Sequence, residues 1–164
     1  MIDTELLRNI CIRRIRSDEP IPFRLLLDAD PSWNAVSKYL ESSEIHIALL
    51  NNKIIASMVL YPLDQATLEI KNIAVASEFQ GRGIGQRLLK EATQIAVAKT
   101  ASNIIIGTSN SSIGQLYLYQ KTGFEITDIK YNFFLDNYPE PIIENGIQCK
   151  HMIMLRKFVC SCFT

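Results

Sequence analysis

The sequence lacks the features that mark a membrane protein or a secreted protein. None of its apolar runs approaches the roughly 20 residues that a membrane-spanning helix needs. The N-terminal stretch, MIDTELLRNICIRR, mixes polar and apolar residues too evenly for the apolar centre of a secretory signal peptide. We therefore expect a cytoplasmic protein without a membrane partner.

An excess of one charge sign is also missing. Lysine plus arginine number 17 and aspartate plus glutamate also number 17, so the formal net charge at pH 7 is zero. Proteins that bind nucleic acid carry basic surfaces, because they neutralise phosphate charge. The balance removes any global electrostatic argument for such binding, and we predict no nucleic-acid partner.

Cysteine and histidine are few, and their spacing fits no metal-binding or redox motif. They are Cys11, Cys149, Cys160, Cys162, His46 and His151. No two cysteines show CxxC spacing, and the histidines complete no zinc pattern with them. We predict reduced thiols that pack as small apolar groups, and no metal site.

Repeats, low-complexity segments and linkers are absent too, which predicts a single domain for 164 residues. We assign residues 1–158 to this domain and residues 159–164 to a C-terminal tail. Strand-like and helical patterns alternate along the chain, so we expect a mixed α/β sheet. The predicted strands are 10–16, 45–50, 54–61, 68–75, 103–108, 124–135 and 148–158, and the predicted helices are 23–40 (split at Pro31), 83–100 and 111–121.

Two connections have recognisable turn chemistry. Asn51-Asn52-Lys53 separates two apolar runs and predicts a hairpin, because asparagine tolerates the positive φ of a tight turn. The segment NYPEPIIENG, residues 137–146, carries prolines and acidic residues and is predicted to be a loop.

Three glycines occupy alternate positions at 81, 83 and 85, between a predicted strand and a predicted helix. The first N–H groups of a helix have no partner within the helix and carry partial positive charge. Glycines at this point let an anion approach those groups closely. The pattern predicts a phosphate or pyrophosphate site, and a simple tight turn is the alternative reading.

Two common phosphate-binding loops do not fit these glycines. A Walker loop ends in Gly-Lys-Ser/Thr, whereas Gly85 is followed by Gln86 and Arg87. A GxGxxG fingerprint would place its last glycine at Gln86 or at Leu88, depending on where it starts.

The same stretch resembles the GNAT superfamily of N-acetyltransferases. QGRGIG, residues 80–85, is similar to the family signature Gln/Arg-x-x-Gly-x-Gly/Ala, which holds the pyrophosphate of acetyl-CoA. The preceding KNIAVASEFQ and the following GQRLLKEA resemble the family's strand, linker and helix. LYQKTGF resembles its second signature, and the opening ICIRRIRSDE is also similar. The resemblance covers nearly the whole chain.

This resemblance implies a mostly antiparallel sheet of six to seven strands, splayed between the fourth and fifth strands and flanked by about four helices. It implies acetyl-CoA as cosubstrate, held by main-chain groups of the fourth strand and by the glycine-rich loop. The implied binding residues are Ile73, Ala74, Val75, Gln80, Gly81, Arg82, Gly83, Ile84, Gly85 and Gln86.

A tyrosine in the second signature is implied to be the general acid that protonates the leaving thiolate. Tyr119, five residues before Phe124, occupies that position, and Tyr117 is a rival. Two helical residues separated by two positions point about 200° apart, so we expect one of them to face the cosubstrate. The motif position favours Tyr119.

Many family members also carry a glutamate in the fourth strand, eleven residues before the signature glutamine. Glu69 has this spacing from Gln80, which makes it our candidate for the general base, with a surface carboxylate as the alternative. Some members that acetylate proteins place an acid on the fifth strand, and NIIIGT, residues 103–108, has none.

The family often has an asparagine after the fifth strand that binds the cosubstrate, usually seven residues before the tyrosine. Asn110 lies nine residues before Tyr119 and Ser112 lies seven before it, so both are candidates, with Asn110 first. Both residue types also cap helices well, which is their alternative role.

The acceptor amine is implied to meet the first helices and the loop between the last two strands. That loop region carries aromatic and acidic residues, which are Tyr131, Phe133, Phe134, Asp136, Tyr138, Glu140 and Glu144. A cationic small-molecule amine or a peptide amine suits such a lining. Three functions are considered: acetylation of a small molecule, acetylation of a protein, and non-catalytic acyl-CoA binding. The resemblance also implies a possible homodimer, because members of the family often form dimers.

Overall fold

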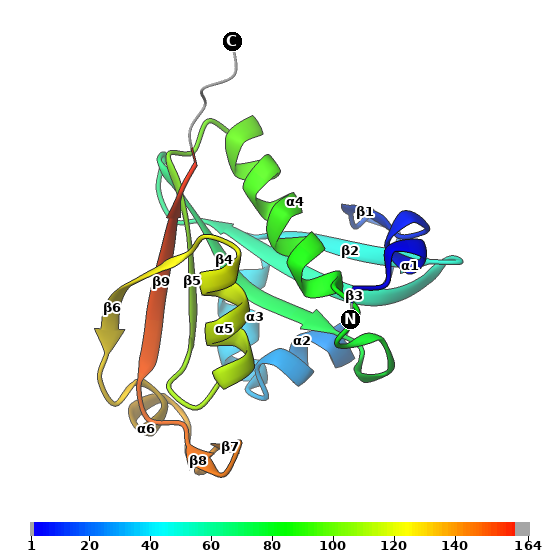
Figure 1. The fold of residues 1–164 in the computed structure, drawn as a ribbon. Helices are drawn as coiled ribbons and strands as arrows, with labels where there is room; N and C mark the ends of the chain where they lie inside the picture. The colour runs from blue at the N-terminus through cyan, green and yellow to red at the C-terminus, as the bar shows by residue number, and fades with distance from the viewer. Residues whose placement is uncertain (1, 160–164) are drawn as a thin grey trace.

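A seven-stranded sheet forms the centre of the protein, with the strand order β1-β2-β3-β4-β5-β9-β6 (Figure 1). The structure, a computed structural model, describes residues 2–159; Cys160 and Cys162 therefore lie outside the described residues. Every neighbouring pair in this sheet is antiparallel except β4–β5, which is parallel. The predicted fold class, a mostly antiparallel sheet of six to seven strands, is confirmed.

The strands are β1 (Cys11–Arg14), β2 (Glu44–Leu50), β3 (Lys53–Pro62), β4 (Thr67–Val75), β5 (Asn103–Ser109), β6 (Glu125–Lys130) and β9 (Met152–Phe158), with a separate pair β7 (Ile143–Glu144) and β8 (Ile147–Gln148). The helices are α1 (Thr4–Arg8), α2 (Phe23–Ala29), α3 (Trp33–Leu40), the 3₁₀ turn η1 (Ser77–Phe79), α4 (Ile84–Ala98), α5 (Ile113–Lys121) and α6 (Phe133–Asn137).

Helices cover both faces of the sheet, and each face has its own apolar core. On one face α4 buries Leu88, Leu89 and Ala92 against the sheet, and Phe124 lies in the same cluster. On the other face α2 and α3 bury a smaller cluster that includes Leu26. Burial of such side chains is the main favourable term in folding, at about 1.5–3 kcal/mol for each large one.

Strands β4 and β5 diverge after a short parallel pairing. The pairing runs from Thr67 and Asn103 to Ile70 and Ile106, where it ends. Next to this point β4 contains a bulge. Val59 of β3 pairs with Asn72 and the next residue, Leu60, pairs with Ile70, so Lys71 has no partner in the register. Beyond it β4 stays paired with β3 while β5 stays paired with β9, so the two strands separate (Figure 1). The expected splay is confirmed.

The hairpin predicted at Asn51-Asn52 is present. Both residues have positive φ, 50° and 63°, and Leu50 pairs with Lys53 across the turn. Such left-handed conformations match the natural twist of the flanking strands, which is why asparagine is favoured here.

The predicted strand 124–135 is wrong in its second half. The strand ends at Lys130, and the chain turns at Asn132 (φ 57°) into helix α6. The N–H of Asn132 donates a hydrogen bond to Nδ1 of His151, 3.0 Å away. This contact joins residues far apart in the sequence, so local apolar pattern did not reveal the turn.

The predicted loop 137–146 and strand 148–158 also differ in detail. A two-residue turn at Asn145 (φ 54°) and Gly146 (φ 73°) joins β7 and β8, so this region contains a small hairpin. The long strand then starts only at Met152. Val159, which we assigned to the tail, is buried, and its N–H donates to the carbonyl of Ser102.

Candidate active site

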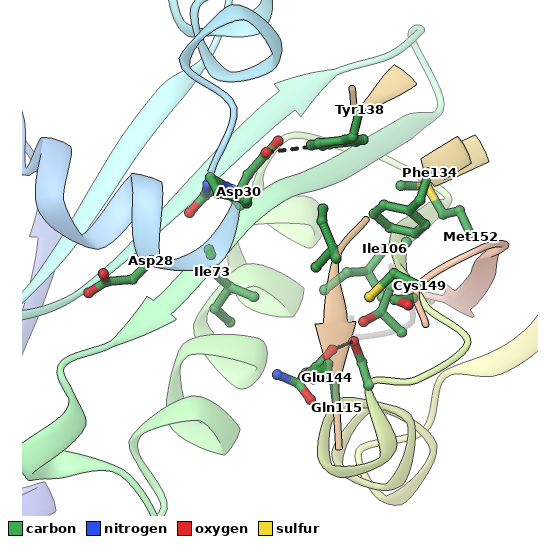
Figure 2. A pocket seen from close by; sticks show the side chains of 18 of the residues that line it. Asp28, Asp30, Ile73, Ile106, Gln115, Phe134, Tyr138, Glu144, Cys149 and Met152 are labelled. Carbon is green, nitrogen blue, oxygen red and sulfur yellow. Dashed lines mark hydrogen bonds between the residues drawn. The ribbon is translucent and has the colours of Figure 1, made fainter. Parts of the chain in front are cut away.

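A cavity of about 460 Å³ lies where β4 and β5 separate (Figure 2). Its walls come from β4, β5, the end of α2, the side of α5 and the segment between β6 and β9. The lining residues that the argument uses are Asp30, Lys71, Ile73, Ser112, Tyr119, Phe134, Tyr138 and Glu144. Five parts of the chain that are distant in sequence therefore meet at one small-molecule-sized space.

Tyr119 is the predicted general acid, and it lines this cavity from α5. Its side chain is buried, with 4% exposed, and its ring packs near that of Phe124. Its hydroxyl has no hydrogen-bond partner among residues 2–159. Burial, with a smaller contribution from the charge of Glu144, raises the pKa of Tyr119 well above its ordinary value. The phenol is therefore protonated at neutral pH.

Tyr117, the rival tyrosine, points elsewhere. It is 63% exposed, and its hydroxyl accepts a hydrogen bond from Nζ of Lys121 one helical turn later. The two side chains lie on different sides of α5, as their spacing predicts.

Ser112 and Glu144 form a pair in the cavity wall. The hydroxyl of Ser112 donates a hydrogen bond to Oε2 of Glu144 at 2.6 Å. Both residues line the cavity with Tyr119 and Gln115, and Figure 2 shows Glu144 beside Gln115. The bond fixes a carboxylate near the buried tyrosine, although Ser112 and Glu144 lie 32 residues apart in sequence.

Asn110 occupies a different position from Ser112. Its Oδ1 accepts hydrogen bonds from the N–H groups of Lys150 (2.7 Å) and His151 (2.9 Å), and its Nδ2 donates to the carbonyl of Gln148 (3.1 Å). The amide therefore ties the end of β5 to the segment between β8 and β9. Of the two predicted alternatives, Ser112 is the one that lines the cavity.

Glu69, the predicted base, lies beside the cavity wall. Its carboxylate is buried, with 8% of the residue exposed, and it forms an ion pair with Nζ of Lys71 at 2.9 Å. Lys71 itself lines the cavity and also lies over the ring of Tyr61. Lys71 therefore contacts Glu69 and also borders the cavity.

The glycine-rich loop leads into α4 as predicted. Gly81 and Gly83 have φ values of 72° and 92°, which favour glycine, and Gly83 is the N-cap of α4. No side chain of the described residues caps this helix end. The first intrahelical bond runs from the N–H of Arg87 to the carbonyl of Gly83, so the three preceding N–H groups stay outside the helical ladder. This end fits an anion such as a pyrophosphate.

The remaining loop residues have more local contacts. The Gln80 side chain donates to the carbonyl of Val75 at 2.9 Å, which closes the turn after β4. The guanidinium of Arg82 lies over the ring of Phe79. A Cβ on Gly85 would stand 3.2 Å from Cδ2 of Leu118, so this glycine also permits close packing of α4 on α5.

Two carboxylates at the end of α2 were not among the site residues predicted from the sequence. Asp28 and Asp30 both line the cavity. Oδ1 of Asp30 accepts hydrogen bonds from the hydroxyl of Tyr138 and from the N–H of Ser32, both at 3.0 Å. Tyr138 is 108 residues away in the chain, so no local pattern could have paired it with Asp30.

The part of the chain that the structure describes has neither a metal-binding cluster nor a membrane-spanning helix. No group of three His, Cys, Asp or Glu residues there could hold a metal ion. No helix in that part is long and apolar enough to cross a membrane. Cys11 and Cys149 are free thiols, the first exposed and the second buried.

Comparison with known proteins agrees with this geometry. The model of the "Acetyltransferase (GNAT) family" matches residues 12–124, which is more than half of the chain. The chain belongs to the GNAT family of acetyltransferases. The resemblance seen in the sequence, and the classification as an acetyltransferase enzyme, are thereby confirmed.

Three relatives are particularly similar. An uncharacterized N-acetyltransferase, YvbK, of Bacillus subtilis (strain 168) is 46% identical over 133 residues, covering 81% of this chain and 86% of the relative. A GNAT family acetyltransferase from Elizabethkingia anophelis, solved with acetyl-CoA bound, is 56% identical with a TM-score of 0.90, covering 92% of this chain and 98% of that one. A Bacillus subtilis acetyltransferase solved with CoA is 41% identical with a TM-score of 0.86, covering 92% and 99%.

Proposed function

We propose that this GNAT protein transfers the acetyl group of acetyl-CoA to a primary amine of a small molecule, by direct attack in a ternary complex. The observation that carries the proposal is the cavity at the β4–β5 splay, with the protonated, unpartnered hydroxyl of Tyr119 in its wall. Two similar proteins were solved with acetyl-CoA or CoA bound, which supports the choice of cosubstrate. The proposed location is the cytoplasm, where reduced thiols such as Cys11 persist.

The cosubstrate would be held mainly by main-chain groups. The N–H groups of Ile84, Gly85 and Gln86 at the start of α4 would bind its pyrophosphate, with Gly81 and Gly83 leaving space for it. The flanking side chains of Gln80 and Arg82 would border that site. The edge of β4 at Ile73, Ala74 and Val75 faces away from β3 and would bind the pantetheine arm as a neighbouring strand does. Ser112 would contact the cosubstrate from the cavity wall. Asn110 would act indirectly, through the backbone segment to which its side chain is hydrogen-bonded.

The reaction requires stabilisation of an oxyanion, protonation of the leaving thiolate and deprotonation of the attacking amine. Acetyl-CoA supplies an acyl thioester, whose carbonyl carbon forms the new C–N bond while the C–S bond breaks. A backbone N–H of the free β4 edge would stabilise the negative charge on the carbonyl oxygen, an effect of about 3 kcal/mol in comparable oxyanion sites. Tyr119 would donate its proton to the departing sulfur, because burial keeps the phenol protonated.

The acceptor amine must also lose a proton. We propose Glu69 as the base, acting through a water molecule next to Lys71, with Glu144 as the alternative because it lies in the cavity wall. Both assignments are separable by pH–rate profiles of the single variants.

Acetylation of a protein N-terminus or lysine is the second candidate function. The cavity's volume of about 460 Å³ matches a small acceptor instead, and β5 contributes no acid to it. A non-catalytic acyl-CoA-binding module is the third candidate, which the intact Tyr119 disfavours.

We also propose that the protein forms a homodimer through β6. This strand is the edge of the sheet, all six of its residues are exposed, and Ile126 and Ile129 are among them. Glu125 begins the strand and Lys130 ends it, so two antiparallel copies would bring opposite charges together at both ends.

Calorimetry with acetyl-CoA and a thiol-release assay with a panel of amines, amino acids and peptides test the proposed function. We expect acetyl-CoA to bind, and thiol release to depend on a small amine. Absence of any binding heat from acetyl-CoA and from CoA would refute acetyl transfer. Thiol release with peptides alone would indicate that the acceptor is a protein and not a small molecule.

A further inference from the structure

The cavity carries an unequal distribution of charge. Its lining includes the carboxylates of Asp30 and Glu144 and one ammonium group, from Lys71, whereas the carboxylate of Asp28, another lining residue, is directed away from the open space (Figure 2). Lys71 is already paired with Glu69 at 2.9 Å, so its charge is compensated outside the open space. An acceptor in this cavity therefore meets a negative environment.

The carboxylates of Glu144 and Asp30 lie at opposite ends of the cavity (Figure 2). Glu144, held by Ser112, lies at the end near Tyr119, while Asp30 and Tyr138 lie together at another part of the wall (Figure 2). Between them the lining is largely apolar, with Phe134 and Ile106 labelled in the same view. Charged ends with an apolar middle match a molecule with two cationic groups and an aliphatic spacer.

The hydroxyl of Tyr119 marks which end is reactive. It is a polar group on a side chain that is only 4% exposed and that lines the cavity, and it lacks a partner among the described residues. Because its oxygen is not among the fully buried polar atoms that lack a partner, the hydroxyl is accessible from the cavity, where a ligand group can complete its hydrogen bonding. The acyl transfer would take place at this end, and the Asp30 end would hold the remainder of the acceptor.

We propose that the acceptor is a dicationic aliphatic amine, whose reacting amine approaches Tyr119 and Glu144 while its second cation binds Asp30. This inference rests on the proposed acetyl transfer and specifies its acceptor. Asp30 is suited to the task because Tyr138 and the backbone of Ser32 both bond to its Oδ1, which orients the carboxylate. Acceptors that carry a free carboxylate at that end would be repelled.

The test uses the unmodified protein and three matched series of acceptors. Straight-chain α,ω-diamines are compared with monoamines and with ω-amino acids of the same chain length, by thiol release. We expect kcat/KM to be highest for a diamine, at least about tenfold above the monoamine, which corresponds to about 1.4 kcal/mol. The ω-amino acids should be the poorest substrates, and added salt should weaken the diamine preference.

Asp30→Asn provides the second arm. It should raise KM for the best diamine by about tenfold and change KM for the matching monoamine by less than about twofold. Asp18→Asn, at an exposed position between β1 and α2, is the control and should leave both values unchanged. Should Asp30→Asn fold poorly, the comparison of the three series on the unmodified protein still decides the inference.

The outcomes separate the inference from the function on which it rests. Binding of acetyl-CoA together with equal or better use of monoamines or ω-amino acids overturns the dicationic acceptor and leaves acetyl transfer intact. Binding of acetyl-CoA with turnover of none of the three series also counts against the inference. Absence of acetyl-CoA binding overturns the proposed function itself.

Discussion

At the scale of single residues, environment decides what each side chain can do. Tyr119 and Tyr117 have the same phenol group and lie on the same helix, yet one is buried in the cavity wall and the other is exposed. Burial disfavours the phenolate, so the pKa of Tyr119 lies above its ordinary value and its acid form persists to higher pH. Any pH limb that reports loss of this acid should accordingly lie above about 10, the ordinary value for tyrosine.

Replacement of Tyr119 by phenylalanine tests its role as the acid. We expect kcat to fall by about 100-fold or more, because the departing thiolate loses its proton donor. The affinity for acetyl-CoA, measured by calorimetry, should stay close to that of the unmodified protein. Tyr117→Phe is the matched control and should leave kcat unchanged, whereas near-normal turnover of Tyr119→Phe would remove this residue from the mechanism.

The two candidate bases make different predictions for pH dependence. Glu69→Gln should lower kcat/KM on the order of 100-fold below the pKa of the acceptor amine, where a proton must still be removed, and less above it. Steady-state measurement of kcat/KM across a range of pH tests this prediction. A profile unchanged by Glu69→Gln but altered by Glu144→Gln would transfer the role to Glu144, and Glu41→Gln at the exposed end of α3 serves as control.

At the scale of elements, the helix start at α4 combines conformation with electrostatics. Gly83 adopts φ 92° as the N-cap, and the N–H groups that follow it precede the first intrahelical hydrogen bond. A side chain at this position would be strained and would contact Ile2 and Leu7, and relief of that strain would move the N–H groups that follow. Stability and anion binding therefore depend on the same residue.

Gly83→Ala should destabilise the protein by about 1 kcal/mol and weaken acetyl-CoA binding. Gly123 has a similar φ of 94° at the end of α5, so Gly123→Ala is a control for backbone strain alone. It should lose comparable stability in urea unfolding but keep its acetyl-CoA affinity in calorimetry. Equal affinities of the two variants would argue against an anion site at the start of α4.

At the scale of the whole molecule, the sheet leaves one long strand without an outer neighbour. Strand β6 pairs only with β9 within the described chain, and exposed edge strands tend to associate with another strand. Pairing with a second copy would cover Ile126 and Ile129 at the same time.

Light scattering at micromolar concentration should find a dimer, and Ile129→Lys should shift it to a monomer because it places a charge in the proposed interface. Leu63→Lys changes an exposed apolar side chain in the turn between β3 and β4, away from β6 in the sheet order, and should leave the dimer intact. A monomeric unmodified protein would refute the dimer.

Local patterns were sufficient to predict much of this protein from its sequence. The Asn51-Asn52 turn, the glycine-led helix α4, the fold class and the GNAT family all follow from residues that lie close together in the chain. Turn chemistry, helix starts and family signatures are local properties, because they depend on backbone conformation and short spacings.

Only the tertiary structure decided which distant groups share the cavity. Asp30 meets Tyr138 across 108 residues, Ser112 meets Glu144, and Asn110 bonds to the segment before β9. The turn at Asn132 likewise depends on His151. These contacts arise because β4 and β5 separate and the β6–β9 segment folds over the opening, and no spacing within a single segment encodes which side chains then face one another.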